Sequence, residues 1–277
     1  MNILYLSDHL PSEDSFIGQD VRLMAKDYSV SYIAMVQSNN SGSIHYPTEY
    51  VPYPVNSFKS KLLWRLEKKD LYLNWYNKNF SSQLNLAIKK INPDIIHCQF
   101  AYEGLKYFDN INDKKTPVVI NFRGYDASYK LKYTKYVEKM KKILLQKNVY
   151  SICVCEALLE MLKNKNIDFA NKPHVLYTGV DIQKFNRTDY SNKNPLFVQV
   201  GAFNDKKGQL ITVKAFQKFI LETGNQNVKI QFVGEGKNLK KVKDYVANNK
   251  LKDRIIFLGR KTHKEIVQIL QNATVFL

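Results

Sequence analysis

The sequence predicts an α/β fold made of two doubly wound domains, each with a parallel sheet. Short apolar runs alternate with segments of helical period along the chain, which is the pattern of β-α-β units. A polar, turn-rich stretch over residues 179–195 interrupts this alternation, which then starts again. The interruption predicts a linker between two domains. No run approaches about 18 consecutive apolar residues, so no membrane-spanning helix is expected.

The first domain is expected over residues 1–178. Its opening run, NILYLS, predicts a strand and lacks the cationic and long apolar regions of a secretory signal. The runs that predict strands are residues 2–7, 30–36, 94–100, 117–122, 149–155 and 174–179. Helical period lies between most of them, at residues 16–27, 78–91, 129–147 and 156–165.

The second domain is expected over residues 196–277. Its strands are predicted at residues 196–201, 228–234, 254–259 and in the closing TVFL, with helices over 208–223, 237–249 and 262–271. The chain stops on this last apolar run, whereas domains usually end on polar surface residues. We therefore expect a sequence that stops inside an incomplete second domain.

Composition is consistent with a folded chain and leaves the partner open. The 277 residues are 44% hydrophobic, with 42 Lys and Arg against 25 Asp and Glu and a net charge of +17. That balance favours an anionic partner such as nucleic acid, anionic lipid or a phosphorylated substrate. Abundant lysine, asparagine and isoleucine equally indicate a general compositional bias. The three cysteines, Cys98, Cys153 and Cys155, lie in apolar runs and predict buried, reduced thiols in a cytoplasmic protein.

Two glycine-containing loops of the second domain could contact a phosphate group. In VGAFNDKKGQL, Gly201 ends a strand, and Lys206, Lys207 and Gly208 open a helix whose free N–H groups suit an anion. The alternative is an ordinary loop with solvated lysines. FVGEGKNL repeats the arrangement, and its Gly234, Glu235 and Gly236 form either a close approach to a ligand or a simple tight turn.

The first domain has polar residues at the ends of two predicted strands, where ligands of such sheets bind. NFRGYDAS places Arg123, Gly124 and Asp126 after one strand, and HCQFAYEG places Glu103 after another. The favoured first role of Asp126 is the N-cap of a helix near residue 129, and Glu103 could simply complement a helix dipole. No Ser/His/Asp set, metal-ligand cluster or nucleic-acid-binding module is recognisable, so neither a metal nor nucleic acid is expected.

Two basic stretches remain. Residues 57–80 mix Lys and Arg with Leu, Trp and Tyr, and residues 129–147 hold seven lysines. A basic helix edged with aromatic residues can lie on an anionic membrane, but an ordinary amphipathic helix has the same composition. We favour membrane contact for residues 57–80 and the ordinary helix for residues 129–147.

Taken in order, these segments resemble glycosyltransferase family 4, whose enzymes have the GT-B fold of two Rossmann-like domains. The segments that carry the resemblance are LPSEDSFIGQDVRLMAKDYSV, INPDIIHCQFA, NFRGYDAS, SICVCEALLEML, HVLYTGVDIQKF, VGAFNDKKG, FVGEGKNL and IIFLGRKTHKEIVQILQNATVFL. The resemblance implies retaining transfer of a hexosyl-type sugar from a UDP- or GDP-linked donor, with no metal and no cofactor. It implies an acceptor that is a polysaccharide or lipid-linked, and a cytoplasmic enzyme at the inner face of the plasma membrane in surface-polysaccharide or lipopolysaccharide assembly.

The resemblance also implies roles for particular residues. Lys207 and Gly208 fall on the family's Lys-Gly pair, and the donor diphosphate is expected at Gly201, Lys206, Lys207 and Gly208. The nucleotide is expected at Gly234, Glu235 and Gly236, and the acceptor near Phe16, Glu103 and Gly124. Arg123 and Asp126 are the candidate catalytic residues.

Three departures separate the chain from the family pattern. Ala202 occupies the place of an arginine that partners the lysine, and Arg123 that of a histidine near the donor sugar. The family also continues past the closing TVFL with a Glu-bearing segment that holds the donor. We therefore expect the chain alone to bind nucleotide sugar weakly and to transfer it poorly. The alternative is a non-catalytic remnant, or an acceptor-binding subunit that needs a partner.

Overall fold

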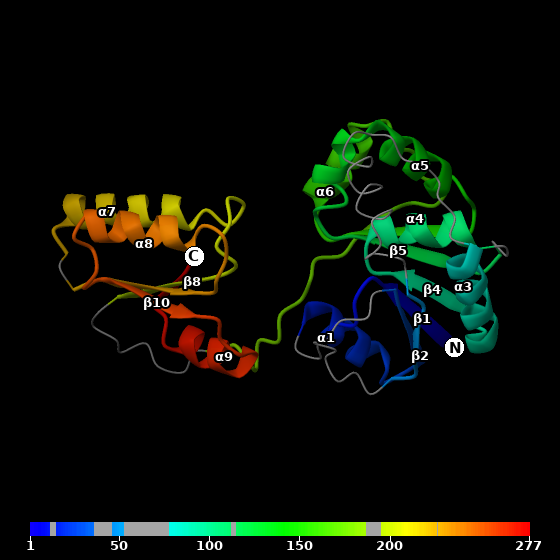
Figure 1. Cartoon of the computed structure of the whole chain (residues 1–277), viewed down its shortest axis with the longest axis horizontal. Helices are drawn as coiled ribbons and strands as arrows, with labels where there is room; N and C mark the ends of the chain where they lie inside the picture. The colour runs from blue at the N-terminus through cyan, green and yellow to red at the C-terminus, as the bar shows by residue number, and fades with distance from the viewer. Residues whose placement is uncertain (12–14, 36–45, 53–77, 112–114, 187–194, 226) are drawn as a thin grey trace. The chain divides into compact units, whose positions relative to one another are not determined.

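The structure is a computed structural model, and it forms two compact units, Met1–Thr178 and Gly179–Leu277 (Figure 1). Each unit is a parallel sheet with helices on both faces. The residues that the structure describes are 1–11, 15–35, 46–52, 78–111, 115–186, 195–225 and 227–277.

The first unit contains a seven-stranded sheet in the order β3-β2-β1-β4-β5-β6-β7, and every pair of neighbours is parallel. Strand β1 is apolar on both faces, as a central strand covered on both sides must be. The strands are β1 Asn2–Ser7, β2 Ser29–Ala34, β3 Thr48–Tyr50, β4 Ile95–Cys98, β5 Val118–Phe122, β6 Val149–Cys153 and β7 His174–Val175.

Helices cover the two faces of this sheet unequally. Helix α1 (Phe16–Met24) packs Ile17 and Val21 against Tyr5 and Tyr32 on one face. The larger core lies on the other face (Figure 1). The helices of that face are α3 Lys78–Ile91, α4 Ala101–Asn110, α5 Thr134–Leu144 and α6 Glu156–Lys163.

The second unit contains a four-stranded parallel sheet in the order β10-β9-β8-β11. Helices α7 and α8 lie over one face and α9 over the other (Figure 1). Its core contains Phe203, Phe216 and Phe232. The elements are β8 Leu196–Val200, α7 Gln209–Thr223, β9 Lys229–Val233, α8 Leu239–Asn248, β10 Ile255–Gly259, α9 His263–Gln271 and β11 Val275–Phe276.

The structure differs from the sequence-based expectation at several places, and one is β7, which ends at Val175 where residue 179 was expected. The helix expected over residues 129–147 is a 3₁₀ turn, η1 (Tyr129–Lys132), followed by α5, because Tyr133 between them has an extended backbone. Strand β3 was not expected, since TEY has no apolar run. Cys98 and Cys153 are buried thiols, whereas Cys155 is only half-buried and lies after β6 as the N-cap of α6.

Most of the basic aromatic stretch 57–80 lies outside the described residues, and only its last three residues appear, as the start of α3. Within the described ranges, none of the helices combines the length and apolar character needed to cross a bilayer.

Candidate ligand sites at the carboxyl ends of the strands

Both sheets contain a point where the strand order reverses, and ligands of open α/β sheets bind at the carboxyl ends of the strands there. In the first unit this point lies between β1 and β4, and in the second between β8 and β11. The loops that follow β1, β4 and β8 are therefore the first places to look for functional groups.

The loop after β8 fixes Lys207 at the start of α7. The Lys207 amide donates to Asn204 Oδ1 at 3.0 Å, and Gln199 Nε2 donates to the Lys207 carbonyl at 2.8 Å. The aliphatic part of Lys207 packs along Gly201, about where a side chain on that glycine would be, with carbons 3.5 Å from the ideal Cβ position. Lys207 is exposed, so its ammonium group lies in solvent beside the amino end of α7.

A hydrogen bond from a buried side chain also stabilises this loop. Gln209, the first residue of α7, is buried, and its Nε2 donates to the carbonyl of Ala202 at 3.1 Å. Gly208 is the N-cap residue of α7, and Lys206 beside it is exposed. The four residues predicted to contact a diphosphate, Gly201, Lys206, Lys207 and Gly208, thus belong to one short, well-bonded loop at a helix N-terminus, which favours an anion.

The loop after β9 packs directly on this first loop, and two glycines make that possible. A Cβ on Gly234 would lie 2.2 Å from the carbonyl oxygen of Gly201, and one on Gly236 would lie 2.5 Å from that of Phe203. Both residues also have positive φ, +131° and +154°, which L side chains rarely adopt. Glu235 between them is exposed, and Arg260 Nε lies 4.0 Å from its Oε2.

Polar side chains reinforce the contact between the two loops. Asp205 accepts from Lys237 Nζ at 2.8 Å and from Asn238 Nδ2 at 2.7 Å, and these hydrogen bonds lower the pKa of Asp205. Ala202 lies on this edge, exposed, where the family resemblance places an arginine. Arg260, directly after β10, is a cation of the same edge that the sequence analysis did not single out. Its position directly after a predicted strand could have indicated it as a candidate ligand-binding residue.

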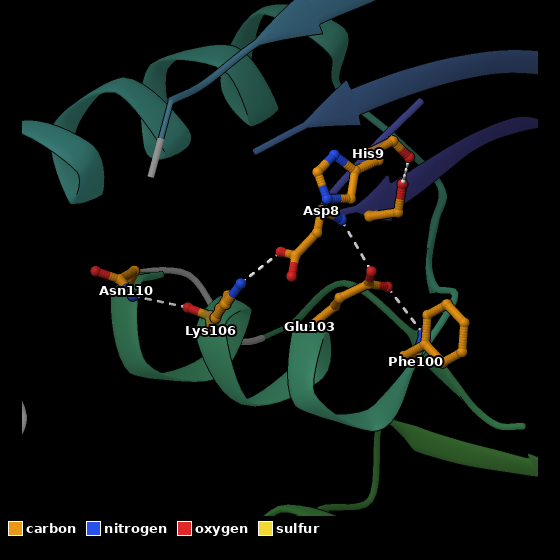
Figure 2. A network of polar contacts seen from close by, with 7 residues as sticks. Asp8, His9, Phe100, Glu103, Lys106 and Asn110 are labelled. Carbon is orange, nitrogen blue, oxygen red and sulfur yellow. Dashed lines mark hydrogen bonds and ion pairs between the residues drawn. The ribbon is translucent and has the colours of Figure 1, made fainter. Parts of the chain in front are cut away.

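In the first unit, Glu103 ties the loops after β1 and β4 together (Figure 2). Its Oε1 accepts from the Asp8 amide at 2.9 Å and its Oε2 from the Phe100 amide at 2.8 Å. Burial raises the pKa of Glu103, and the charge of Asp8 adds to the rise, while these N–H bonds and Lys106 oppose it. Glu103 is buried at 1% exposure, so it closes the first turn of α4 and positions Asp8.

Asp8 and Lys106 form an ion pair beside Glu103 that the sequence analysis missed (Figure 2). Both side chains remain partly exposed, at 23% and 18%. Asp8 follows β1 directly, so the signal was present in the first strand, but its partner is 98 residues away. The pair lies at the point where the strand order of this sheet reverses.

Arg123 joins α1 to the ends of β4 and β5. Its Nη2 donates to Asp20 Oδ2 and to Gln99 Oε1, each at 2.9 Å, and its Nε donates to the Gln99 carbonyl at 3.2 Å. The guanidinium carbon lies 4.9 Å from the centre of the Phe16 ring. With its side chain 5% exposed, Arg123 is a clamp within the unit, and Phe16, half of whose surface is exposed, is the group nearest solvent.

Asp126 organises the turn after β5 and is fully buried. Its carboxylate accepts from the amides of Ala101, Arg123, Gly124 and Ala127 at 2.9–3.1 Å. Burial raises its pKa, against the opposing effect of these hydrogen bonds. The expectation that Asp126 caps the helix near residue 129 is wrong: the N-cap of η1 is Ser128. Asp126 instead bonds the first amide of α4, because its side chain points back toward that helix.

The structure thus brings Phe16, Arg123, Gly124 and Asp126 together at the carboxyl ends of β4 and β5, with Glu103 in the neighbouring network. The diphosphate and nucleotide candidates lie together in the second unit. Among the residues that the structure describes, no group of three or more His, Cys, Asp or Glu side chains could hold a metal ion.

Two family models match consecutive parts of the chain. Glycosyltransferase Family 4 matches residues 70–184, and Glycosyl transferases group 1 matches residues 181–277. A search of curated proteins finds no match.

Solved structures share the fold over nearly the whole chain. HepE of Anabaena, in complex with UDP and glucose, is 15% identical with a TM-score of 0.67, covering 100% of this chain and 73% of that one. The lipopolysaccharide outer core galactosyltransferase WaaB is 15% identical with a TM-score of 0.63, over 100% and 73%. Sucrose-phosphate synthase of Thermosynechococcus elongatus is 16% identical with a TM-score of 0.69, over 100% and 74%. From the two family models, and from the parallel α/β fold shared with these structures, the chain belongs to the family 4 type of glycosyltransferases with the GT-B fold.

Proposed function

We propose that the protein transfers a hexosyl-type sugar from a nucleotide diphosphate sugar to an acceptor hydroxyl, with retention at the anomeric carbon and without a metal. The bond between the anomeric carbon and the diphosphate oxygen breaks, and the acceptor oxygen forms the new bond and releases its proton to water. The nucleoside diphosphate leaves with the additional negative charge. Stabilising that charge is therefore the main task of the donor site.

The observation that carries this proposal is the loop around Lys207. It sets an exposed ammonium group, held along Gly201, beside the amino end of the fifteen-residue helix α7. A diphosphate at this position would meet the Lys207 charge, the positive end of the helix dipole and free backbone amides together. Lys206 and Arg260 add positive charge at the same edge.

The nucleotide is proposed to lie against Gly234, Glu235 and Gly236. The exposed carboxylate of Glu235 is an acceptor for ribose or base hydroxyl and amino groups. HepE has been solved with UDP-glucose, which makes a uridine sugar the first donor to test and a guanosine sugar the second.

The acceptor is proposed to bind the first unit near Phe16 and Gly124. A lipid-linked oligosaccharide or a growing polysaccharide suits the family resemblance, with the enzyme working in the cytoplasm at the inner face of the membrane. The side chains of Arg123 and Asp126 are fully engaged in contacts inside the unit. We therefore propose that they position the acceptor-side loops and make little direct contact with the reacting sugar.

A nucleotide-sugar hydrolysis assay tests the proposal. The purified chain is incubated with UDP-glucose and, separately, GDP-mannose, and released nucleoside diphosphate is measured. We expect release from at least one donor, and a loss of at least tenfold in Lys207→Ala. The matched control is Lys218→Ala, an exposed lysine of the same helix that pairs only with Glu222 at 3.5 Å among the described residues.

Nucleotide binding without release would favour the alternative, an acceptor-binding or non-catalytic protein. The exposed Ala202 in the place of the family's arginine is the feature that supports this second function. Absence of both binding and release would contradict the proposed donor site.

A further inference from the structure

A cluster of tyrosines and lysines lies directly beyond the turn that Asp126 organises. The rings of Tyr125 and Tyr129 stack with centroids 5.0 Å apart and planes 15° from parallel, and Tyr133 meets Tyr129 edge-on at 6.1 Å. Tyr125 and Tyr129 are 47% and 46% exposed. Stacked aromatic rings are ordinarily found in cores and interfaces, so a stack with nearly half of its surface in solvent is a candidate contact for a ligand.

Two ammonium groups are held over these rings. Lys132 Nζ lies 3.4 Å from the centre of the Tyr129 ring and 5.0 Å from that of Tyr133. Lys130 Nζ lies 5.9 Å from the Tyr125 centre and 5.7 Å from the Tyr133 centre. A cation over a ring face is attracted by the ring quadrupole, which restrains the ammonium group but leaves its N–H donors able to bind an anion.

Within the described part of the chain, no acidic side chain balances this charge. Among the residues that the structure describes, neither Lys130 nor Lys132 forms an ion pair with a carboxylate. The carboxylate nearest in sequence, Asp126, is fully buried and already bonded to backbone amides. Two adjacent cations with no carboxylate partner in the described ranges give this surface a positive potential that attracts negative ligands.

The cluster is firmly attached to the proposed acceptor side. The Lys130 amide donates to the Tyr125 carbonyl at 3.0 Å, and Tyr136 Oη donates to the Asp126 carbonyl at 2.9 Å. Ser128 Oγ bonds the carbonyl of Gly124, one of the acceptor-side candidates. The rings and ammonium groups therefore begin one residue after Gly124, at the carboxyl end of β5.

We propose that Tyr125, Tyr129 and Tyr133 with Lys130 and Lys132, the tyrosine–lysine platform, bind an acceptor sugar that carries a phosphate or carboxylate group. The C–H face of a pyranose ring packs on an exposed tyrosine, because its slightly positive hydrogens meet the negative ring face. The two ammonium groups bind the anion attached to that sugar. This inference rests on the proposed function, since it names the chemical class of its acceptor.

NMR titration of the whole chain with three probes tests the platform: glucose 6-phosphate, glucuronate and uncharged glucose. We expect both charged probes to bind at least tenfold more tightly than glucose. The double variant K130Q/K132Q should lose that preference. The control K141Q/K142Q, which removes the same charge from the last turn of α5, should keep it.

A second pair of variants tests the rings. Tyr125→Leu should weaken all three sugars several-fold, whereas Tyr28→Leu should have no effect. Tyr28 is also exposed, at 39%, but it precedes β2 and so lies at the amino ends of the strands, away from the platform. UDP is titrated into every sample as a separate measurement. If the unmodified chain does not bind UDP, the proposed donor function is contradicted. The binding of the sugar probes then still tests the platform independently.

Three results would overturn the platform. One is equal affinity for charged and uncharged probes, and another is an equal loss of preference in K141Q/K142Q. The third is platform-dependent binding to phosphatidylglycerol vesicles without binding of any sugar probe, which would make the surface a membrane contact.

Discussion

Arg123 lies where the family resemblance places a histidine, and its contacts explain what a guanidinium does there. It connects the side chains of Asp20 and Gln99, which come from α1 and from the end of β4. A guanidinium provides several donors in a fixed plane, which suits three separate contacts better than an imidazole would. The departure from the family pattern therefore carries a structural role that is visible in the fold.

Replacing this guanidinium should loosen the first unit. Arg123→Gln leaves the partly exposed Asp20 and the fully buried Gln99 without their donor. We expect a loss of roughly 2–4 kcal/mol in the free energy of unfolding. Thermal and urea unfolding measure it. The control is Arg22→Gln, at an exposed arginine of α1, the helix that contributes Asp20. Equal stability of the two variants would show that the clamp contributes nothing.

His97 makes a pH-dependent contribution to stability. Its ring packs on Tyr5 with centroids 5.0 Å apart, and burial, helped by the charge of Arg123, lowers its pKa from 6.5 to about 4. The unfolded chain therefore binds a proton first as the pH falls. The stability from neutral His97 is fully present above pH 6.5 and is lost as the pH falls through 6.5 toward 4.

We expect this residue alone to account for about 3 kcal/mol of destabilisation between those two pH values. His97→Gln should flatten the acid side of the stability curve, measured by urea unfolding from pH 7 to pH 4. His174→Gln, at an exposed histidine, should keep the slope of the unmodified chain. A slope unchanged in His97→Gln would rule out this explanation.

At the scale of elements, regular helical periodicity predicted α3 correctly, but the position where a helix is interrupted could not be predicted from it. The helix expected over residues 78–91 is α3, with those bounds. The helix expected over 129–147 is divided at Tyr133, because the turn built by Asp126 and the bond from Tyr136 to its carbonyl fix where α5 begins. Such a bond depends on tertiary structure and leaves no mark in the periodicity.

The two glycines of the loop after β9 make an element-scale prediction. Gly234→Ala would place a methyl group 2.2 Å from the Gly201 carbonyl oxygen, so the two loops must separate. We expect at least a tenfold loss of UDP affinity by calorimetry. Gly224→Ala at the C-cap of α7, where an added Cβ meets nothing within 4 Å, should retain the affinity although its φ is also positive, at +63°. Equal affinity in both variants would show that the contact between the loops does not shape the site.

At the scale of the whole molecule, the order of apolar runs predicted the α/β class and the parallel sheets, which the structure confirms. Parts of the sites could also be predicted from the sequence, because polar residues directly after strands must gather at one edge of a parallel sheet. The hydrogen-bonding partners of these residues could not be predicted from the sequence. Arg123 meets Asp20 across 103 residues and Lys106 meets Asp8 across 98, and no spacing rule links such positions.

The central claim is that a nucleotide sugar binds at the carboxyl edge of the second sheet, on the loops at Gly201–Gly208 and Gly234–Gly236. Amide hydrogen exchange of the chain with and without UDP-glucose and GDP-mannose tests it most directly. The account predicts that at least one of these donors slows exchange in both loops and at the first amides of α7. Protection confined to other segments, or none at millimolar donor, would contradict it.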